Sequence, residues 1–258
     1  MLAFGTHPDD LEITCGGTLI LLRRQGWRVG AVDLTRGELG TRGSAESRAR
    51  ETEAANRILK LDFRVNLGLP DGNIETTQEN LMAVIRQIRQ HRPWLVIAPY
   101  WEERHYDHVH ASRLIAEAAF YSGLSKIETG QPAWRPFRVM FYVGRIGFNP
   151  SFVVDISSTF EEKMKALRCY STQVESRQMI AAPDRKPDNK KDQREPETLI
   201  STPYAMQVFE TMTRYYGAMI GAAHGEPFVV REALELNDPV AYFRQFPADR
   251  QAHLFPQE

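Results

Sequence analysis

Cysteine is scarce in this sequence. Among its 258 residues only Cys15 and Cys169 are cysteines, and they stand far apart with no CxxC spacing. Such a pair excludes a disulfide scaffold and a zinc site built from cysteines, so both are expected to be free thiols. No apolar run approaches the roughly 20 residues that span a bilayer, and the chain opens on a strand-like segment instead of a secretory signal. We therefore expect a soluble cytoplasmic protein that does not enter a membrane.

An excess of charge of either sign is also absent. The 32 Lys and Arg residues balance 33 Asp and Glu residues, which gives a formal net charge of -1. This balance offers no electrostatic basis for a nucleic-acid partner or for binding to an anionic membrane. The hydrophobic share of 42% and the charged share of 25% are ordinary for a globular α/β protein. A single domain over residues 1–258 is expected.

Ionisable side chains are concentrated close to the beginning of the chain. The apolar residues 2–4 are typical of a short buried strand, and His7, Asp9, Asp10 and Glu12 follow it within a few positions. Helix capping by Asp9 or Asp10 would explain one of these carboxylates and leave the other groups unexplained. A metal site or an acid/base site at the end of a strand explains all of them better.

A second cluster of this kind lies about a hundred residues later. The continuous apolar segment 94–99 predicts a strand buried on both faces, and His105, Asp107, His108 and His110 come after it. Both clusters thus follow the carboxyl end of a predicted strand. If the two strands are neighbours, the clusters meet at one edge of the sheet.

The first hundred residues alternate between predicted strands and helices. Apolar spacing and turn residues indicate helices over 17–25, 44–60 and 78–91, with Ser44 or Ser47 as the cap of the second, and further strands over 29–34 and 63–67. This alternation predicts a Rossmann-like α/β fold with a mostly parallel sheet and helices on both faces. If the fourth strand returns beside the first, the site lies at the carboxyl ends of strands 1 and 4.

The remaining segments give weaker predictions. The loop 35–43, with three glycines and two arginines, is expected to border the site. Strands are expected at 139–143 and 152–156, helices at 158–170 and 202–219, and an edge strand after Gly225. The charged and proline-rich stretch 181–198 has the composition of a mobile loop, which could be either a lid or a solvated insertion. The tail 238–258, with Phe243, Phe246 and Phe255, is expected to pack on another surface such as a neighbouring subunit.

The residue types in the two clusters favour metal-assisted hydrolysis. Two imidazoles and one carboxylate with an open position form the usual ligand set of a catalytic zinc, and a further carboxylate can deprotonate the attacking water. The sequence does not separate Zn²⁺ from Fe²⁺ or Co²⁺. Spacing alone also does not choose His108 over His105 or His110, or Asp10 over Asp9.

The motifs HPDDLE at residues 7–12 and HYDH at residues 105–108 resemble the paired motifs of the PIG-L/LmbE-like zinc deacetylases, which remove acetyl groups from N-acetylglucosamine conjugates. The resemblance implies that His7, Asp10 and His108 hold Zn²⁺ and that Asp9 is the general base. It implies that His105 stabilises charge or protonates the leaving amine. Asp107 is placed to orient an imidazole from behind.

Within this family the chain is most similar to the enzymes that deacetylate N-acetylglucosaminyl-malate in bacillithiol biosynthesis. The supporting segments are residues 69–71, 104–108, 152–157, 170–173 and 225–228. The resemblance implies a homo-oligomer, such as a hexamer. Arginine binds carboxylates bidentately, so arginines suit a malate-bearing substrate.

Two departures from the family pattern bear on the substrate site. Tyr106 stands where the later motif usually has proline. Arg104 occupies the position where some members place a tyrosine that donates to the oxyanion, so Tyr142 in strand 139–143 is the candidate replacement. Arg48 resembles the substrate-binding arginine of the family, and Arg104 adjoins the metal motif. Three further arginines near Arg48 are expected to be solvated surface charges: Arg36, Arg42 and Arg50.

Three other functions compete with metal-dependent deacetylation. A dinucleotide-binding oxidoreductase is excluded because residues 5–10 do not form GxGxxG and their carboxylates would repel a pyrophosphate. A non-catalytic metal-binding or assembly subunit is disfavoured by the intact Asp9 and His105. A deacetylase of another N-acetyl amino sugar stays open.

Overall fold

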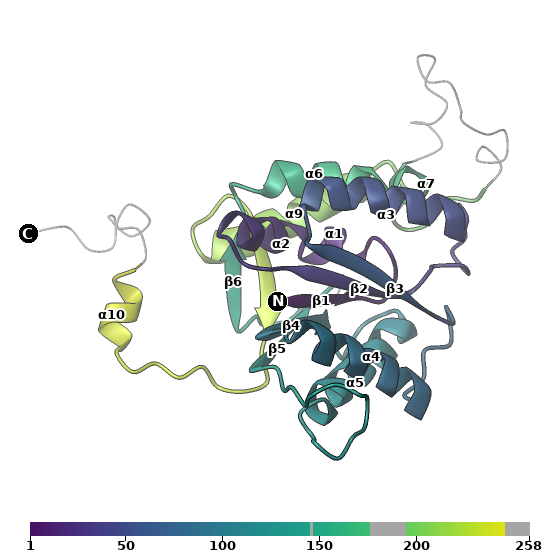
Figure 1. The fold of residues 1–258 in the computed structure, drawn as a ribbon. Coiled ribbons are helices and arrows are strands. Elements are labelled where there is room, and N and C mark those ends of the chain that lie inside the picture. Colours follow the sequence, from purple (N-terminus) through teal and green to yellow (C-terminus); the bar gives the residue numbers. More distant parts are fainter. Residues whose placement is uncertain (145–146, 176–194, 246–258) are drawn as a thin grey trace, which may run out of the picture.

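The computed structural model describes residues 1–144, 147–175 and 195–245, and over these residues the chain forms a seven-stranded sheet (Figure 1). The strand order is β3-β2-β1-β4-β5-β7-β6. Strands β1 to β5 are parallel, and β7 runs antiparallel to both of its neighbours. The strands are β1 Leu2–Gly5, β2 Gly30–Thr35, β3 Phe63–Leu69, β4 Leu95–Pro99, β5 Arg138–Tyr142, β6 Phe152–Asp155 and β7 Gly225–Val229.

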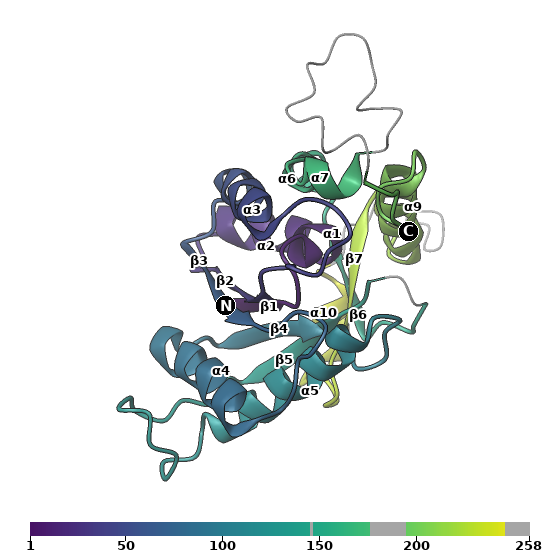
Figure 2. The same ribbon diagram turned by 90° about the vertical axis from the view of Figure 1, so that its right-hand side faces the viewer.

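Helices cover both faces of this sheet, as Figure 2 shows, and the predicted Rossmann-like α/β fold is confirmed. One face carries α2, α3 and α6, and the other carries α4 and α5. The helices of the first half are α1 Asp10–Thr14, α2 Gly16–Arg24, α3 Ala45–Leu59, α4 Gln78–His91 and α5 Tyr106–Tyr121. Those of the second half are α6 Phe160–Arg168, α7 Ser171–Val174, α9 Ala205–Met219 and α10 Pro239–Phe243.

The central strands are apolar because both of their faces are buried. In β1, Leu2 and Phe4 pack into the core beneath α4 and α5, whereas Ala3 faces the core beneath α2 and α3. All three side chains are fully buried. Burial of a large apolar side chain contributes about 1.5–3 kcal/mol, so these strands stabilise the frame from which the site loops extend.

The first and fourth strands are neighbours, as expected. Residue Leu2 pairs with Val96 and Ala3 pairs with Ile97. From β1 the chain first builds β2 and β3 on one side and then crosses to β4 on the other. The loops after β1 and β4 therefore diverge at the topological switch point, where open α/β sheets bind ligands.

Several predicted boundaries agree with the structure and a few are corrected. Ser44 caps α3 by accepting from the Ser47 backbone N–H in a capping box. The helix predicted at 17–25 begins at Gly16, and the short α1 precedes it. The expected edge strand after Gly225 is wrong, because β7 lies between β5 and β6, with Phe228 fully buried. Strand β6 forms the edge instead.

Two predictions fall largely outside the described residues. Most of the stretch 181–198 and the tail positions Phe246 and Phe255 lie there. Within the described part of the tail, Phe243 in α10 is 59% exposed. Among the described residues, no helix combines the length and the apolar character needed to cross a membrane.

Candidate metal centre and active site

The loop between β1 and α1 gives the site its shape. Asp9 adopts a left-handed backbone conformation with φ of 115°, which is rare for a residue with a side chain and costs about 1–3 kcal/mol. The Pro8 carbonyl accepts a hydrogen bond of 2.7 Å from Arg48 Nη1, which fixes the peptide before this bend. The bend lets His7, Asp9 and Asp10 face a single cavity.

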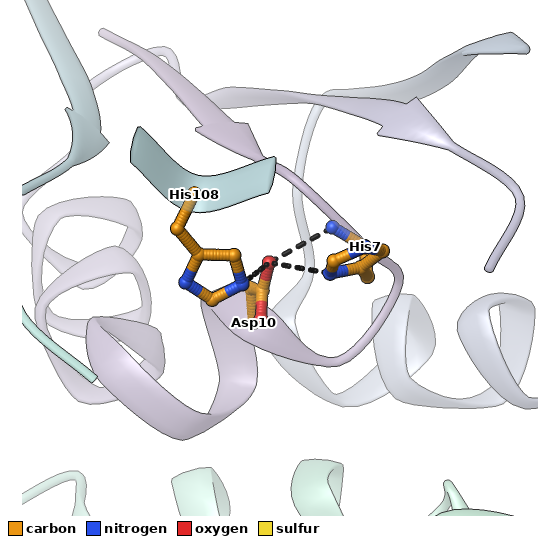
Figure 3. Close-up of side chains that lie close together, drawn as sticks. All are labelled: His7, Asp10 and His108. Carbon is orange, nitrogen blue, oxygen red and sulfur yellow. Dashed lines mark hydrogen bonds and ion pairs between the residues drawn. The ribbon is translucent and has the colours of Figure 1, made fainter. Parts of the chain in front are cut away.

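The side chains of His7, Asp10 and His108 converge, and Figure 3 shows how they point toward one another. Asp10 Oδ2 accepts from the His7 backbone N–H at 2.8 Å and lies 3.7 Å from His7 Nδ1 and 3.3 Å from His108 Nε2. The three potential ligand atoms lie within 4.8 Å of one another. Two imidazole nitrogens and a carboxylate oxygen are the donor set of catalytic zinc sites with an open position, so these residues fit a divalent metal ion.

Two carboxylates support the far side of the His7 ring. Asp71 Oδ1 lies 3.0 Å from His7 Nε2, and Asp107 Oδ2 lies 3.4 Å from the same nitrogen. Nδ1 of the same ring faces Asp10. A carboxylate on the ring nitrogen that does not bind the metal is the typical support of a metal-binding histidine. A second group of ligand-type atoms, from His7, His105 and Asp107, uses the side of His7 that Asp71 contacts. Because Asp71 already contacts His7 Nε2, the group of His7, Asp10 and His108 is the better metal site.

The same carboxylates set the protonation of His7 in the metal-free protein. Burial lowers the pKa of His7, but the hydrogen bonds to Asp107 and Asp71 more than offset it and raise the pKa to about 10. Burial raises the pKa of Asp10, but His108 and His7 outweigh it, so the Asp10 pKa lies below its ordinary value. The metal-free site is thus an imidazolium surrounded by carboxylates.

Asp9 is buried at the wall of the cavity and lies beside Arg48. Its Oδ2 is 3.3 Å from Arg48 Nη1. Burial raises the pKa of Asp9 to about 7, against the opposing effect of the Arg48 charge. A carboxylate that titrates near neutral pH is suited to accept and return a proton.

The environment of Arg48 differs from the expected one. Its guanidinium donates to the Pro8 carbonyl and to Asp9, and Nη2 donates to Gln173 Oε1 at 2.5 Å. A Cβ at Gly37 or at Gly40 would lie 3.1 Å from this guanidinium. The loop 35–43, called the glycine loop from here on, therefore packs closely over Arg48. Arg48 lines the cavity, but its hydrogen bonds hold the candidate base Asp9 in place.

The cavity has a volume of about 380 Å³ and opens between the glycine loop and α9. As expected, the loop 35–43 borders it, through Gly37, Leu39, Gly40 and Thr41. Arg104 and His105 also line it, and both are exposed. Apolar side chains line it as well, among them Leu199, Ile200 and Phe209. The cavity therefore combines polar groups at the candidate metal ligands with apolar side chains, as ligand-binding cavities commonly do.

His105 is oriented by the start of α5. Its Nδ1 accepts from the Asp107 backbone N–H at 3.3 Å, so the neutral ring carries its proton on Nε2. Burial and the neighbouring His7 and His108 lower the pKa of His105, which favours this neutral form. An Nε2–H at the cavity can donate to a developing oxyanion.

Tyr142 does not belong to the cavity, and the expectation that it supplies the oxyanion donor is corrected. The side chain is 1% exposed, and its hydroxyl donates to the Phe4 carbonyl at 3.1 Å. It lies in the core between the sheet and α2 because strand β5 directs it inward. Arg42 is corrected as well: it is buried and donates to the Glu175 carbonyl, whereas Arg36 and Arg50 are exposed as expected.

Sequence reasoning missed three side chains that hold the site together. Asp71 contacts His7 and also accepts from the Leu39 backbone N–H at 2.8 Å, which ties the glycine loop to a candidate metal ligand. Gln173 contacts Arg48, and Glu51 holds the start of α7 by accepting from the Thr172 backbone N–H at 2.8 Å. The Pro-Asp-Gly turn at residues 70–72 was the available signal for Asp71.

Comparison with known proteins finds a family and a relative that are both named as deacetylases. The PIG-L family profile, described as GlcNAc-PI de-N-acetylase, matches residues 2–119. A diacetylchitobiose deacetylase of Thermococcus kodakarensis is 31% identical over 194 residues, which cover 67% of this chain and 69% of that protein.

Two solved structures extend the likeness to the fold. The conserved protein TT1542 from Thermus thermophilus is 35% identical, with a TM-score of 0.78 over 92% of this chain and 96% of that one. The N,N'-diacetylchitobiose deacetylase from Pyrococcus horikoshii is 26% identical, with a TM-score of 0.71 over 89% of this chain and 82% of that one. With the paired His and Asp motifs at the ends of β1 and β4, these matches show that the chain belongs to the PIG-L family of deacetylases.

Proposed function

We propose that this protein is a metal-dependent N-deacetylase that hydrolyses the acetamide of an N-acetylglucosamine conjugate. The observation that carries the proposal is the position of Asp9. Its side chain shares one cavity with the three converging side chains that could bind a metal ion, and its pKa is raised to about 7. The family profile is described as a GlcNAc-PI de-N-acetylase and the Thermococcus relative as a diacetylchitobiose deacetylase, and both names support the same reaction.

His7, Asp10 and His108 would hold the metal ion, and we propose Zn²⁺ for it. The nitrogen and oxygen ligands also suit Fe²⁺ or another divalent ion, so metal availability takes part in the choice. When bound, a divalent ion there polarises the acetamide carbonyl and lowers the pKa of water. Asp71 and Asp107 fix the His7 ring from behind.

The protein's own groups account for the proton movements. Asp9 Oδ accepts a proton from the water that attacks the acetamide carbon, and Arg48 holds this carboxylate toward the cavity. His105 Nε2–H donates to the oxygen that gains charge as the C–O bond forms. The C–N bond then breaks, and the proton held on Asp9 passes to the leaving amine, which yields acetate and a free amino sugar.

For the substrate we propose N-acetylglucosaminyl-malate, in a cytoplasmic step of bacillithiol biosynthesis. The resemblance of the segments 69–71, 104–108, 152–157, 170–173 and 225–228 to the enzymes of that pathway supports this choice. Because Arg48 is engaged within the protein, Arg104 at the cavity is the arginine that we assign to the malate carboxylates. A bidentate contact to a planar guanidinium suits a carboxylate.

Amine release from three substrates tests this proposal. N-acetylglucosaminyl-malate, diacetylchitobiose and free N-acetylglucosamine are compared on zinc-loaded and chelator-stripped protein. We expect metal-dependent release with a preference for the malate conjugate. Arg104→Gln should raise KM for that conjugate about tenfold and leave diacetylchitobiose unaffected. The control Arg36→Gln, at an exposed arginine of a separate cavity, should change neither.

The other outcomes separate the remaining functions. Equal release from all three substrates would retain the deacetylase and discard the malate conjugate. Release from none, with metal bound, would favour a non-catalytic metal-binding subunit.

A further inference from the structure

A small side pocket adjoins the active-site cavity. The two spaces share four lining residues, which are Ile13, Thr14, Gly144 and Phe209. Ile13 and Thr14 belong to α1 and stand three and four positions after Asp10, which places the three side chains on one side of that helix. Because Asp10 is a candidate metal ligand, the side pocket begins next to the candidate metal site.

The surface of this side pocket is mainly apolar. Ile13 and Phe209 line its junction with the cavity, and the interior adds the side chains of Val143, Met212 and Tyr216. Val143 and Tyr216 are buried, whereas Met212 is partly exposed. These three interior residues do not line the active-site cavity, so each can be changed while the walls of that cavity stay as they are.

The polar side chains around the side pocket are engaged within the protein. Lys163 Nζ donates to the Ile13 carbonyl at 2.8 Å and to Glu226 Oε1, with which it forms a buried ion pair. Glu226 also accepts from two backbone N–H groups at the start of α2. The hydroxyls of Thr14 and Thr213 donate to backbone carbonyls of their own helices. A polar ligand group would lose its hydrogen bonds to water and find these partners taken, so the side pocket favours an apolar group.

The size of the side pocket limits what can enter it. Its volume is about 20 Å³, and about 10–15 Å³ admits one group of the size of a water molecule. One methyl group therefore fits, and a sugar ring does not. In the proposed substrate the reacting carbonyl carbon joins an amino sugar to a short acyl chain. Of these two parts, only the acyl chain is small and apolar enough for this space.

We propose that the side pocket binds the acyl chain of the substrate and that the protein hydrolyses N-propionyl as well as N-acetyl amino sugars. The acetyl methyl stands at the junction of the two spaces, and a propionyl group places one further methyl inside the pocket. The reaction balances in the same way for both acyl groups. The water oxygen bonds to the acyl carbon, the C–N bond breaks, and the products are a carboxylate and a free amine. This inference rests on the proposed N-deacetylation and extends it to a longer acyl group.

Amine release from a series of acyl derivatives tests the proposal on the zinc-loaded wild type. The N-acetyl, N-propionyl, N-glycolyl and N-butyryl forms are made on glucosaminyl-malate and on glucosamine, so that the ratios within a series do not depend on the malate group. We expect kcat/KM for the propionyl form to equal or exceed that for the acetyl form. The glycolyl group has the size of propionyl but ends in a hydroxyl, and the butyryl group is one methylene longer. Both should therefore lie at least about tenfold below propionyl in kcat/KM.

Two substitutions inside the side pocket test where the acyl chain binds. Met212→Ala enlarges the pocket and should raise kcat/KM for the butyryl form at least about tenfold, whereas Val143→Leu fills it and should lower kcat/KM for the propionyl form about tenfold. Both variants should keep kcat/KM for the acetyl form within about threefold, because neither side chain lines the active-site cavity. The matched control is Met206→Ala, at a partly buried methionine of α9 that lines neither space. Thermal unfolding shows that each variant is folded.

The outcomes separate this inference from the proposed activity. Metal-dependent release from the acetyl form, with propionyl at least about tenfold lower or with glycolyl equal to propionyl, would retain the deacetylase and overturn the role of the side pocket. A Met212→Ala variant whose preference among the acyl groups equals that of Met206→Ala would overturn it as well. Release from none of the derivatives, with metal bound, would overturn both the activity and the inference.

Discussion

Arg48 and Asp9 form a buried ion pair, with 3.3 Å between Nη1 and Oδ2. The same guanidinium nitrogen donates to the carbonyl of Pro8, directly before the left-handed Asp9. Arg48 therefore fixes both the backbone and the side chain of the candidate base. This pairing explains why an arginine at a substrate cavity is turned toward the protein.

Replacing Arg48 should lower turnover more than it lowers metal binding. Arg48→Met leaves the Asp9 carboxylate without its cation and Gln173 without its donor. We expect kcat to fall roughly 10²-fold, because the base is no longer held in place. Arg48→Lys, which keeps the charge and loses the three-way contact, should recover part of the rate. Arg50→Met, at an exposed arginine of the same helix, is the control. A fall in metal content equal to the fall in kcat would contradict this role.

Removing the support of His7 should weaken metal binding. In Asp71→Asn the hydrogen bond to His7 Nε2 can persist, but the negative charge that orients the ring and makes it a stronger ligand is lost. Loss of such support costs about 10–100-fold in metal affinity. Competition with a chelating dye measures the change. Asp62→Asn is a suitable control, since Asp62 pairs with Arg23 at the far end of the sheet. An unchanged affinity would show that Asp71 only orders the glycine loop.

Metal binding should release protons. The pKa of His7 in the metal-free protein is raised to about 10, so its ring is protonated at pH 7, and a metal ligand must be neutral. Binding at pH 7 should therefore release about one proton from His7, and affinity should increase as the pH rises toward 10. Titration calorimetry in two buffers of different ionisation enthalpy measures the number. A heat that does not depend on the buffer would contradict the imidazolium assignment.

Tyr142→Phe should leave catalysis intact. The hydroxyl donates to the Phe4 carbonyl within the core and does not reach the cavity. Its loss should cost about 1 kcal/mol of the free energy of unfolding and lower Tm by a few degrees. The kcat of the variant and of the wild type are compared on one substrate. A tenfold fall in kcat with an unchanged Tm would return Tyr142 to the active site.

The sequence alone was sufficient to predict the frame of the molecule. Strand and helix periodicity are local signals, and strands β1 and β4 are apolar runs each followed by a charged cluster. Their adjacency was a conditional expectation, because the handedness of crossover connections restricts the possible topologies without choosing the strand order. The pairing of β1 with β4 in the structure confirms it. The choice of Asp10 over Asp9 and of His108 over His105 did not follow from spacing. It came from the family resemblance, and the convergence of His7, Asp10 and His108 agrees with it.

The burial of individual arginines and tyrosines could not be read from the sequence. Arg42, Arg48 and Arg50 are close in sequence, yet only the first two are buried, because they donate hydrogen bonds to the Glu175 carbonyl and to Gln173, in and directly after α7. Asp71 lies 64 positions from His7 in the sequence, so the contact between the two side chains depends on the position of the turn after β3 in the folded protein. Such contacts between distant segments are set by tertiary packing, and residue type alone does not predict them.

The most direct measurement of the central claim combines metal content with amine release for the wild type, Asp9→Ala and His108→Ala, each loaded with Zn²⁺ and dialysed. We predict that Asp9→Ala keeps about one ion per chain and loses roughly 10²–10⁴-fold in turnover, since the base is gone and the ligands stay. His108→Ala should lose the ion itself, because one of three ligands is removed. An Asp9→Ala variant with near-normal turnover, or a His108→Ala variant that retains its ion, would contradict the account.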